Sequence, residues 1–113
     1  MQEYEIKNYT PCPVSVRFFR DGGMETITFP SLGVALLREE QRLIEKINGI
    51  PIYRTEYKGI TGLPDPVVDV YLIVPMLVAK ASCRKDLLSP DSGPNCIRDD
   101  TGRISAVQGL LSW

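Results

Sequence analysis

The sequence predicts a β-rich α+β fold, a single domain over residues 1–113 built of antiparallel hairpins with one short helix. Two turn motifs support this prediction, Arg20-Asp21-Gly22-Gly23 and Ile47-Asn48-Gly49-Ile50, because such pairs adopt the positive φ angles of two-residue hairpin turns. Between the turns, β-branched and aromatic residues alternate with polar ones, as in half-buried strands. The 113 residues are 43% hydrophobic and 24% charged, which is typical of one globular domain.

The first half of the chain predicts three strands. Glu3 to Asn8 alternates and ends at the break Tyr9-Thr10-Pro11-Cys12-Pro13. The next strand runs to the first turn, and Met24 to Phe29 returns as its antiparallel partner. The apolar residues that share the inner face of that second strand are Val14, Val16 and Phe18, with Arg17 on the opposite face and Phe19 as an exposed exception.

The segment from Val34 to Ile47 has two interpretations. Its charged middle contains good helix formers with apolar residues at helical spacing. The Asn48-Gly49 turn instead requires strands on both sides, from Arg42 to Ile47 and from Ile50 to Tyr57. We prefer strands that flank a charged loop.

The second half begins with the most apolar segment. Val68 to Val74 is rich in β-branched residues and predicts the central strand. Pro75 suits the first position of a helix over Met76 to Cys83, and Asp86 to Ser89 is expected to be a short strand. A final hairpin is expected from Asn95 to Arg98 and from Arg103 to Leu111.

Composition excludes several classes of chemistry. The chain has no histidine, which removes histidine triads, histidine-ligated metals and histidine pH switches. Its three cysteines lack the short spacing of a zinc site, so we expect free thiols that pack as small hydrophobes. We therefore expect no catalytic residues, no metal and no cofactor; a hydrolase that acts on a nucleotide through Asp99 and Asp100 is the third alternative.

Charge and hydropathy exclude two classes of binding partner. A net charge of −1 argues against a nucleic-acid polymer as partner. The apolar stretches are too short for a membrane span, and no secretory signal is visible. We expect a protein of the cytoplasm that binds neither nucleic acid nor membrane.

The densest polar cluster runs from Arg84 to Arg103. Arginine suits two-pronged recognition of phosphate or carboxylate, and a Ser-Gly segment can turn backbone N–H groups toward an anion. The alternative is that these residues form turns and surface ion pairs. The candidate ligand-binding residues are Arg84, Asp86, Ser92, Gly93, Asn95, Arg98 and Asp99.

Several short motifs, taken in order, resemble a family of small proteins from phage and prophage genomes. They are Asn8-Tyr9-Thr10-Pro11-Cys12-Pro13-Val14, Gly62-Leu63-Pro64, Arg84-Lys85-Asp86-Leu87, Pro90-Asp91-Ser92-Gly93-Pro94 and Ile97-Arg98-Asp99-Asp100. Family members tend to carry histidine where this chain has Cys12.

The resemblance implies a small accessory protein in the cytoplasm of a phage-infected cell. The leading expectation is a non-catalytic protein that sequesters a small phosphorylated or nucleotide-type signalling ligand against host defence. The alternative is a protein–protein inhibitor or virion accessory protein without a small ligand. We also expect a homo-oligomer, since exposed strand edges and apolar residues such as Phe19 and Trp113 are costly in a monomer.

Overall fold

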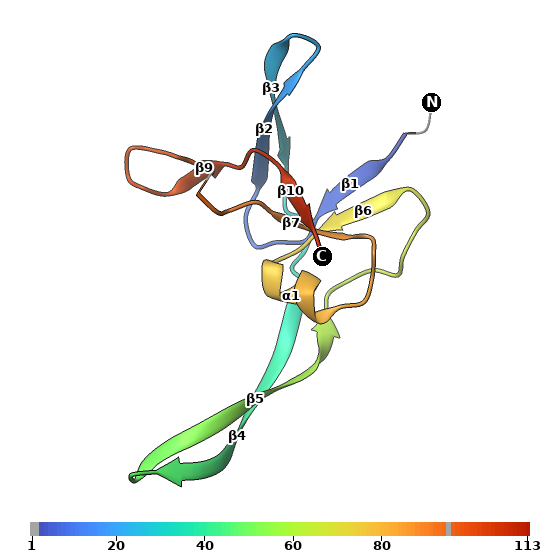
Figure 1. Cartoon of the computed structure of the whole chain (residues 1–113). Coiled ribbons are helices and arrows are strands. Elements are labelled where there is room, and N and C mark those ends of the chain that lie inside the picture. Colours follow the sequence, from blue (N-terminus) through green and yellow to red (C-terminus); the bar gives the residue numbers. More distant parts are fainter. Residues whose placement is uncertain (1–2, 95) are drawn as a thin grey trace.

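The computed structural model describes residues 3–94 and 96–113 and contains a small central sheet from which hairpins extend (Figure 1). The sheet has the strand order β1-β6-β7-β10. Its strands are β1 (Glu5–Asn8), β6 (Val70–Ile73), β7 (Leu87–Pro90) and β10 (Leu110–Ser112), and the only helix in the described part of the chain is α1 (Met76–Ala81). The prediction of a β-rich α+β fold with one short helix is confirmed.

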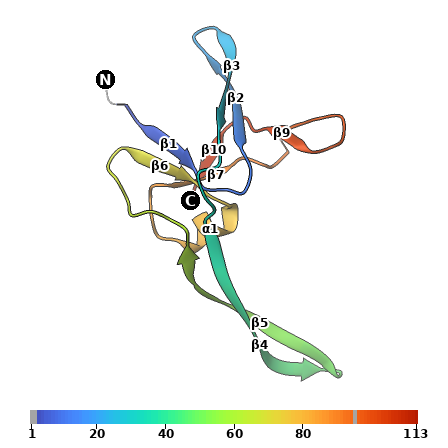
Figure 2. The same ribbon diagram turned by 180° about the vertical axis from the view of Figure 1, so that it is seen from behind.

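Three hairpins surround the sheet and point in different directions (Figures 1 and 2). They are β2 (Val14–Arg20) with β3 (Gly23–Phe29), β4 (Leu36–Ile47) with β5 (Ile50–Thr61), and β8 (Ile97–Arg98) with β9 (Ile104–Ala106). Asp21 and Gly22 have φ angles of 51° and 84°, and Asn48 and Gly49 have 52° and 79°. Both predicted two-residue turns are therefore present.

The core lies on both faces of β6. Leu72 faces α1, where it packs in a cluster with Val78 and Ala79. Ile73 faces the other way and packs with Val16 and Val107. A strand covered on both faces is expected to be continuously apolar, which explains the composition of this segment and confirms it as an interior strand of the sheet.

The sheet also contains parallel pairs that the sequence analysis did not anticipate. β6 pairs in parallel with both β1 and β7, and β10 is antiparallel to β7. Parallel strands require a crossover connection, and α1 lies in the connection between β6 and β7.

The interpretation of the charged segment before Arg42 as a loop was wrong. β4 is continuous from Leu36 to Ile47 and pairs with β5, with irregular register near residues 38–39 and 43–45. The ion pairs Arg42–Glu56 (3.4 Å) and Lys58–Glu40 (3.5 Å) join the two strands. These pairs offset the poor strand propensity of the charged residues.

Several other boundaries differ from the prediction. The helix ends at Ala81 rather than at Cys83, and β5 continues past Tyr57 to Thr61. Val68 precedes the central strand, in a turn, and is 86% exposed. The second strand of the final hairpin ends at Ala106, because Val107 is buried in the core and leads the chain to β10, which pairs with β7. In the described part of the chain, no helix has the length and apolar character needed to cross a bilayer.

Candidate functional site

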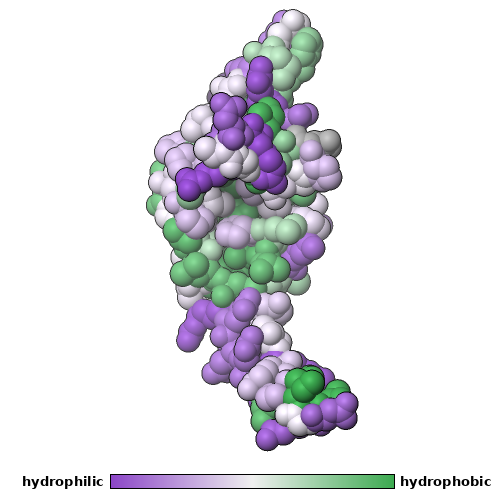
Figure 3. All heavy atoms as spheres, turned by 90° about the vertical axis from the view of Figure 1, so that its left-hand side faces the viewer, coloured by the Kyte–Doolittle hydropathy of each residue, from purple (hydrophilic) through white to green (hydrophobic). Residues whose placement is uncertain are grey.

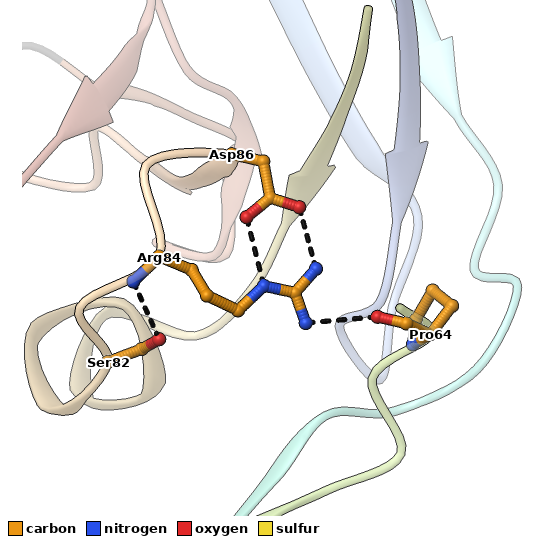
Figure 4. Close-up of polar contacts among 4 residues, drawn as sticks. All are labelled: Pro64, Ser82, Arg84 and Asp86. Atoms are coloured by element: carbon orange, nitrogen blue, oxygen red, sulfur yellow. Dashed lines mark hydrogen bonds and ion pairs between the residues drawn. The ribbon is translucent and has the colours of Figure 1, made fainter. Parts of the chain in front are cut away.

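Arg84 and Asp86 form a two-pronged ion pair next to the sheet (Figure 4). The Arg84 Nε and Nη2 groups donate to the two Asp86 carboxylate oxygens at 3.0 and 2.6 Å. Nη1 donates to the backbone carbonyl of Pro64 at 2.9 Å. The guanidinium thus connects the loop before β6 to the start of β7. Both predicted ligand residues therefore bond within the chain.

Electrostatics agree with this role for the pair. The hydrogen bonds from Arg84 hold the pKa of Asp86 below its ordinary value, and the same bonds raise the pKa of Arg84. Both side chains are less than one quarter exposed. The pair is therefore charged at neutral pH and is partly shielded from water.

Arg98 and Asp99 lie in a different place, at the turn of the β8–β9 hairpin. Arg98 donates to the carbonyl of Gly102 at 2.8 Å. The Asp99 carboxylate accepts from the hydroxyl and backbone N–H of Thr101 and from the backbone N–H of Arg103, and the hydroxyl contact lowers the pKa of Asp99. These are the turn-forming contacts of the alternative interpretation.

The structure does not bring the predicted residues into one pocket. Arg84 joins the α1–β7 connection to the loop before β6, whereas Arg98 bonds within its own hairpin, so the two guanidinium groups serve separate structural contacts. Ser92 and Gly93 lie in the loop after β7, and Ser92 lines a cavity. Asn95, the remaining candidate, lies outside the described residues.

This cavity, of about 360 Å³, is the better candidate for a ligand site. Four segments wall it, namely residues 10–15, 75–76, 90 and 92, and 104–107. They combine prolines and aliphatic side chains with the hydroxyls of Thr10, Ser15, Ser92 and Ser105. A mostly apolar wall with a few polar groups, within the volume range of small-molecule sites, is typical of ligand pockets.

A buried asparagine shapes one wall of the cavity. Asn8 at the end of β1 is 0% exposed. Its Oδ1 accepts from the backbone N–H and hydroxyl of Thr10 at 2.9 and 2.6 Å. Its Nδ2 donates to the carbonyls of Cys12 and Phe29, both at 2.9 Å. The side chain therefore satisfies the polar groups of the loop and fixes it between the sheet and β3.

A positive charge is available close to the cavity. Arg17 lies on the same face of β2 as Ser15, which lines the wall, and residues two apart on a strand are about 7 Å apart. The Arg17 backbone N–H donates to the carbonyl of Val107, another wall residue, at 2.8 Å. Within the described residues no carboxylate forms an ion pair with the exposed Arg17 guanidinium.

The cysteines are more accessible than the sequence analysis expected. Cys12 and Cys83 are exposed, and Cys96 is half-buried. The expectation of packed thiols was therefore wrong for the first two, because Cys12 lies in the cavity wall and Cys83 follows α1 on the surface. All three are free. Among residues 3–94 and 96–113, no group of three or more Cys, Asp or Glu side chains is placed to hold a metal ion.

Sequence reasoning missed most of the cavity wall. Four of the seven residues that it singled out as ligands are charged, and among the described ones Ser92 alone lines the wall, which is built mainly from prolines, hydroxyl-bearing residues and aliphatic groups. One signal was present in the sequence. Two of the motifs that carry the family resemblance, residues 8–14 and 90–94, lie far apart in the chain and both supply wall residues.

Comparisons with known proteins identify no relative of this chain. No protein-family model, curated protein or solved structure matches the chain. The site must therefore be interpreted from its own geometry.

Proposed function

We propose that the protein is a non-catalytic binding protein that sequesters a small phosphorylated or nucleotide-type ligand in the cavity between β2, β9 and residues 10–13. The observation that carries the proposal is the cavity itself, with its volume of about 360 Å³ and its proline-rich, hydroxyl-bearing wall. A flat apolar group such as a nucleobase suits the wall. The Ser92 hydroxyl suits a sugar, whereas the hydroxyls of Thr10, Ser15 and Ser105 already bond within the chain.

Arg17 is the residue that we expect to hold the phosphate. Arg17 is exposed and lies two residues along β2 from the wall residue Ser15, and arginine recognises phosphate with two parallel hydrogen bonds. Serine and threonine hydroxyls together with one arginine can bind an anionic ligand, and these groups supply neither a general base nor a strong general acid near pH 7. The exposed Cys12 thiol is also in the wall, but the chain has no histidine that could activate it as a nucleophile. We therefore expect the ligand to be held and released unchanged.

The biological setting of the proposal comes from the sequence resemblance alone. A small protein of a phage-infected cell that holds a nucleotide signal would lower the free concentration of that signal and so counter host defence. The second candidate function, a protein–protein inhibitor or virion accessory protein without a small ligand, predicts an empty cavity.

The test is incubation of the purified protein with a panel of cyclic nucleotides and ADP-ribose-type compounds, followed by calorimetry and heat release. Recovery of one compound, intact, supports the proposal. Recovery of an altered compound would indicate an enzyme, and retention of no compound would favour the second candidate. Either result would overturn the proposal.

Three variants connect the binding to the cavity. Ala106→Trp fills the cavity from β9 and should abolish binding. Arg17→Ala should weaken binding about tenfold or more, since a hydrogen bond to a charged group contributes about 1.5–3 kcal/mol. The matched control is Arg98→Ala, whose guanidinium is engaged within its own turn and whose loss should leave binding unchanged.

A further inference from the structure

The wall of the cavity carries no side chain with a formal charge. Among the described residues that line it there is no aspartate, glutamate, lysine or arginine. Charged residues adjoin the wall along the chain instead, with Asp91 between residues 90 and 92, Arg103 before residue 104, and Arg17 two positions after residue 15. Figure 3 shows the side of the molecule on which β9 lies, where hydrophilic side chains gather above a hydrophobic area of the body. Charge is therefore available beside the cavity and not within its wall.

The wall is also poor in hydrogen-bond donors for an anion. Four of its residues are prolines, which have no backbone N–H. The Thr10 hydroxyl donates to Asn8 Oδ1 at 2.6 Å, and the Ser105 hydroxyl donates to a carbonyl of β8 at 3.2 Å. The backbone N–H of Ser92 donates to the carbonyl of Pro90 at 2.9 Å. A phosphate inside the cavity would therefore lose its water without gaining the donors that its oxygens need, which is costly for a charged group.

The signs of the adjoining charges distinguish two parts of the wall. Asp91 is half-buried in the loop after β7, directly after the wall residue Pro90, and its carboxylate repels a phosphate. Arg17 on β2 is exposed, and its backbone N–H donates to the carbonyl of the wall residue Val107 at 2.8 Å. Arg103, also exposed, directly precedes β9 and adds positive charge to the same part. A phosphate is therefore favoured where β2 and β9 meet and disfavoured at the loop after β7.

We propose that the cavity takes the uncharged nucleoside end of its ligand and leaves the phosphate groups outside, next to Arg17. The inference rests on the proposed function and deepens it, because it assigns the two ends of the ligand to two parts of the site. The volume of about 360 Å³ lies near the lower limit of small-molecule sites, about 300–1,000 Å³, which suits one nucleoside. The ligand class is therefore a nucleotide with one free nucleoside end, whose phosphates beyond the first stay in water.

The experiment is calorimetry with the four common ribonucleosides and their 5′-mono-, di- and triphosphates. For the base that binds, the nucleoside should bind about tenfold more weakly than its monophosphate, because it lacks the charged contact with Arg17. The three phosphorylated forms should agree within about fivefold, since charges that stay in water contribute little. Inorganic pyrophosphate should not displace the nucleoside.

Two variants separate the ends of the ligand. Arg17→Ala should remove the difference in affinity between the nucleoside and its monophosphate. Ala106→Trp fills the cavity and should abolish binding of both compounds. The matched control is Gln108→Ala, because Gln108 is exposed directly after the wall residue Val107 and should change neither affinity.

Failure of this inference is distinguishable from failure of the proposed function. The inference alone is overturned if affinity rises more than about tenfold with each added phosphate, if pyrophosphate displaces the nucleoside, or if Arg17→Ala keeps the difference between nucleoside and monophosphate. Binding of a cyclic nucleotide or an ADP-ribose-type compound without binding of any nucleoside has the same meaning. If no compound of either series binds, the proposed function is overturned and this inference with it.

Discussion

Replacing Asn8 with alanine removes the side chain that holds the 8–13 loop between the sheet and β3. Asn8 makes four hydrogen bonds, with distances between 2.6 and 2.9 Å, from a fully buried position. A typical hydrogen bond contributes about 0.5–1.5 kcal/mol net, and a buried partner left unsatisfied costs more. Because the Thr10 hydroxyl still bonds to the carbonyl of Cys12 at 2.9 Å, its bond to Asn8 is replaced; we expect a loss near the middle of that range for each of the other three bonds, about 3 kcal/mol in all.

Urea unfolding monitored by Trp113 fluorescence and circular dichroism measures this loss. Trp113 is the only tryptophan of the chain, and its indole N–H donates to buried Ser89 at 2.8 Å, so its emission reports on the central sheet. The exposed Gln108→Ala is the control and should change stability by less than about 0.5 kcal/mol. A loss below about 1 kcal/mol for Asn8→Ala would refute the reasoning.

A second variant tests the orientation of the amide. Asn8→Asp keeps an acceptor toward Thr10 but turns the other oxygen toward the carbonyls of Cys12 and Phe29. We expect it to be at least as destabilised as the alanine variant at neutral pH, since two acceptors then face a carboxylate oxygen. If Asp were tolerated, the amide would have to be oriented the other way.

Two further predictions concern stability. Arg84 lowers the pKa of Asp86 in the folded state. The stabilisation that the ionised Asp86 gives to the fold is therefore fully present above the unfolded pKa of about 3.9, and it is lost as pH falls through the lower folded value. Asp86→Asn should lower the unfolding midpoint at pH 7 and, in acid titrations, flatten the loss of stability below pH 4. Gly62 and Gly102 have φ angles of 86° and 84°, but a Cβ at Gly62 would collide with the backbone oxygen of Val34, whereas one at Gly102 meets nothing. In thermal melts, Gly62→Ala should thus cost clearly more than the roughly 1–2 kcal/mol of left-handed strain expected for Gly102→Ala, and equal losses would contradict the clash.

Local sequence patterns were sufficient to predict the features that depend only on residues close together in the chain. The Asp21-Gly22 and Asn48-Gly49 turns require positive φ, and few residue pairs adopt it readily, so these hairpins were predictable. The contacts of Asp99 with Thr101 and Arg103 are likewise local, and the sequence analysis carried this turn-forming role as its alternative.

Contacts between distant segments decided the rest, because no local pattern reports them. The parallel pairing of β6 with β1 and β7 depends on burial of both faces of β6. The cavity exists because residues 10–15 and 104–107 meet across the molecule, and Arg84 bonds to Pro64 and Asp86 instead of converging with Arg98. The amino-acid sequence by itself determined the turns, the apolar central strand and the absence of histidine chemistry. Only the tertiary structure decided which polar groups satisfy one another and which surfaces stay open, since hydrogen-bond partners and cavity walls depend on three-dimensional proximity.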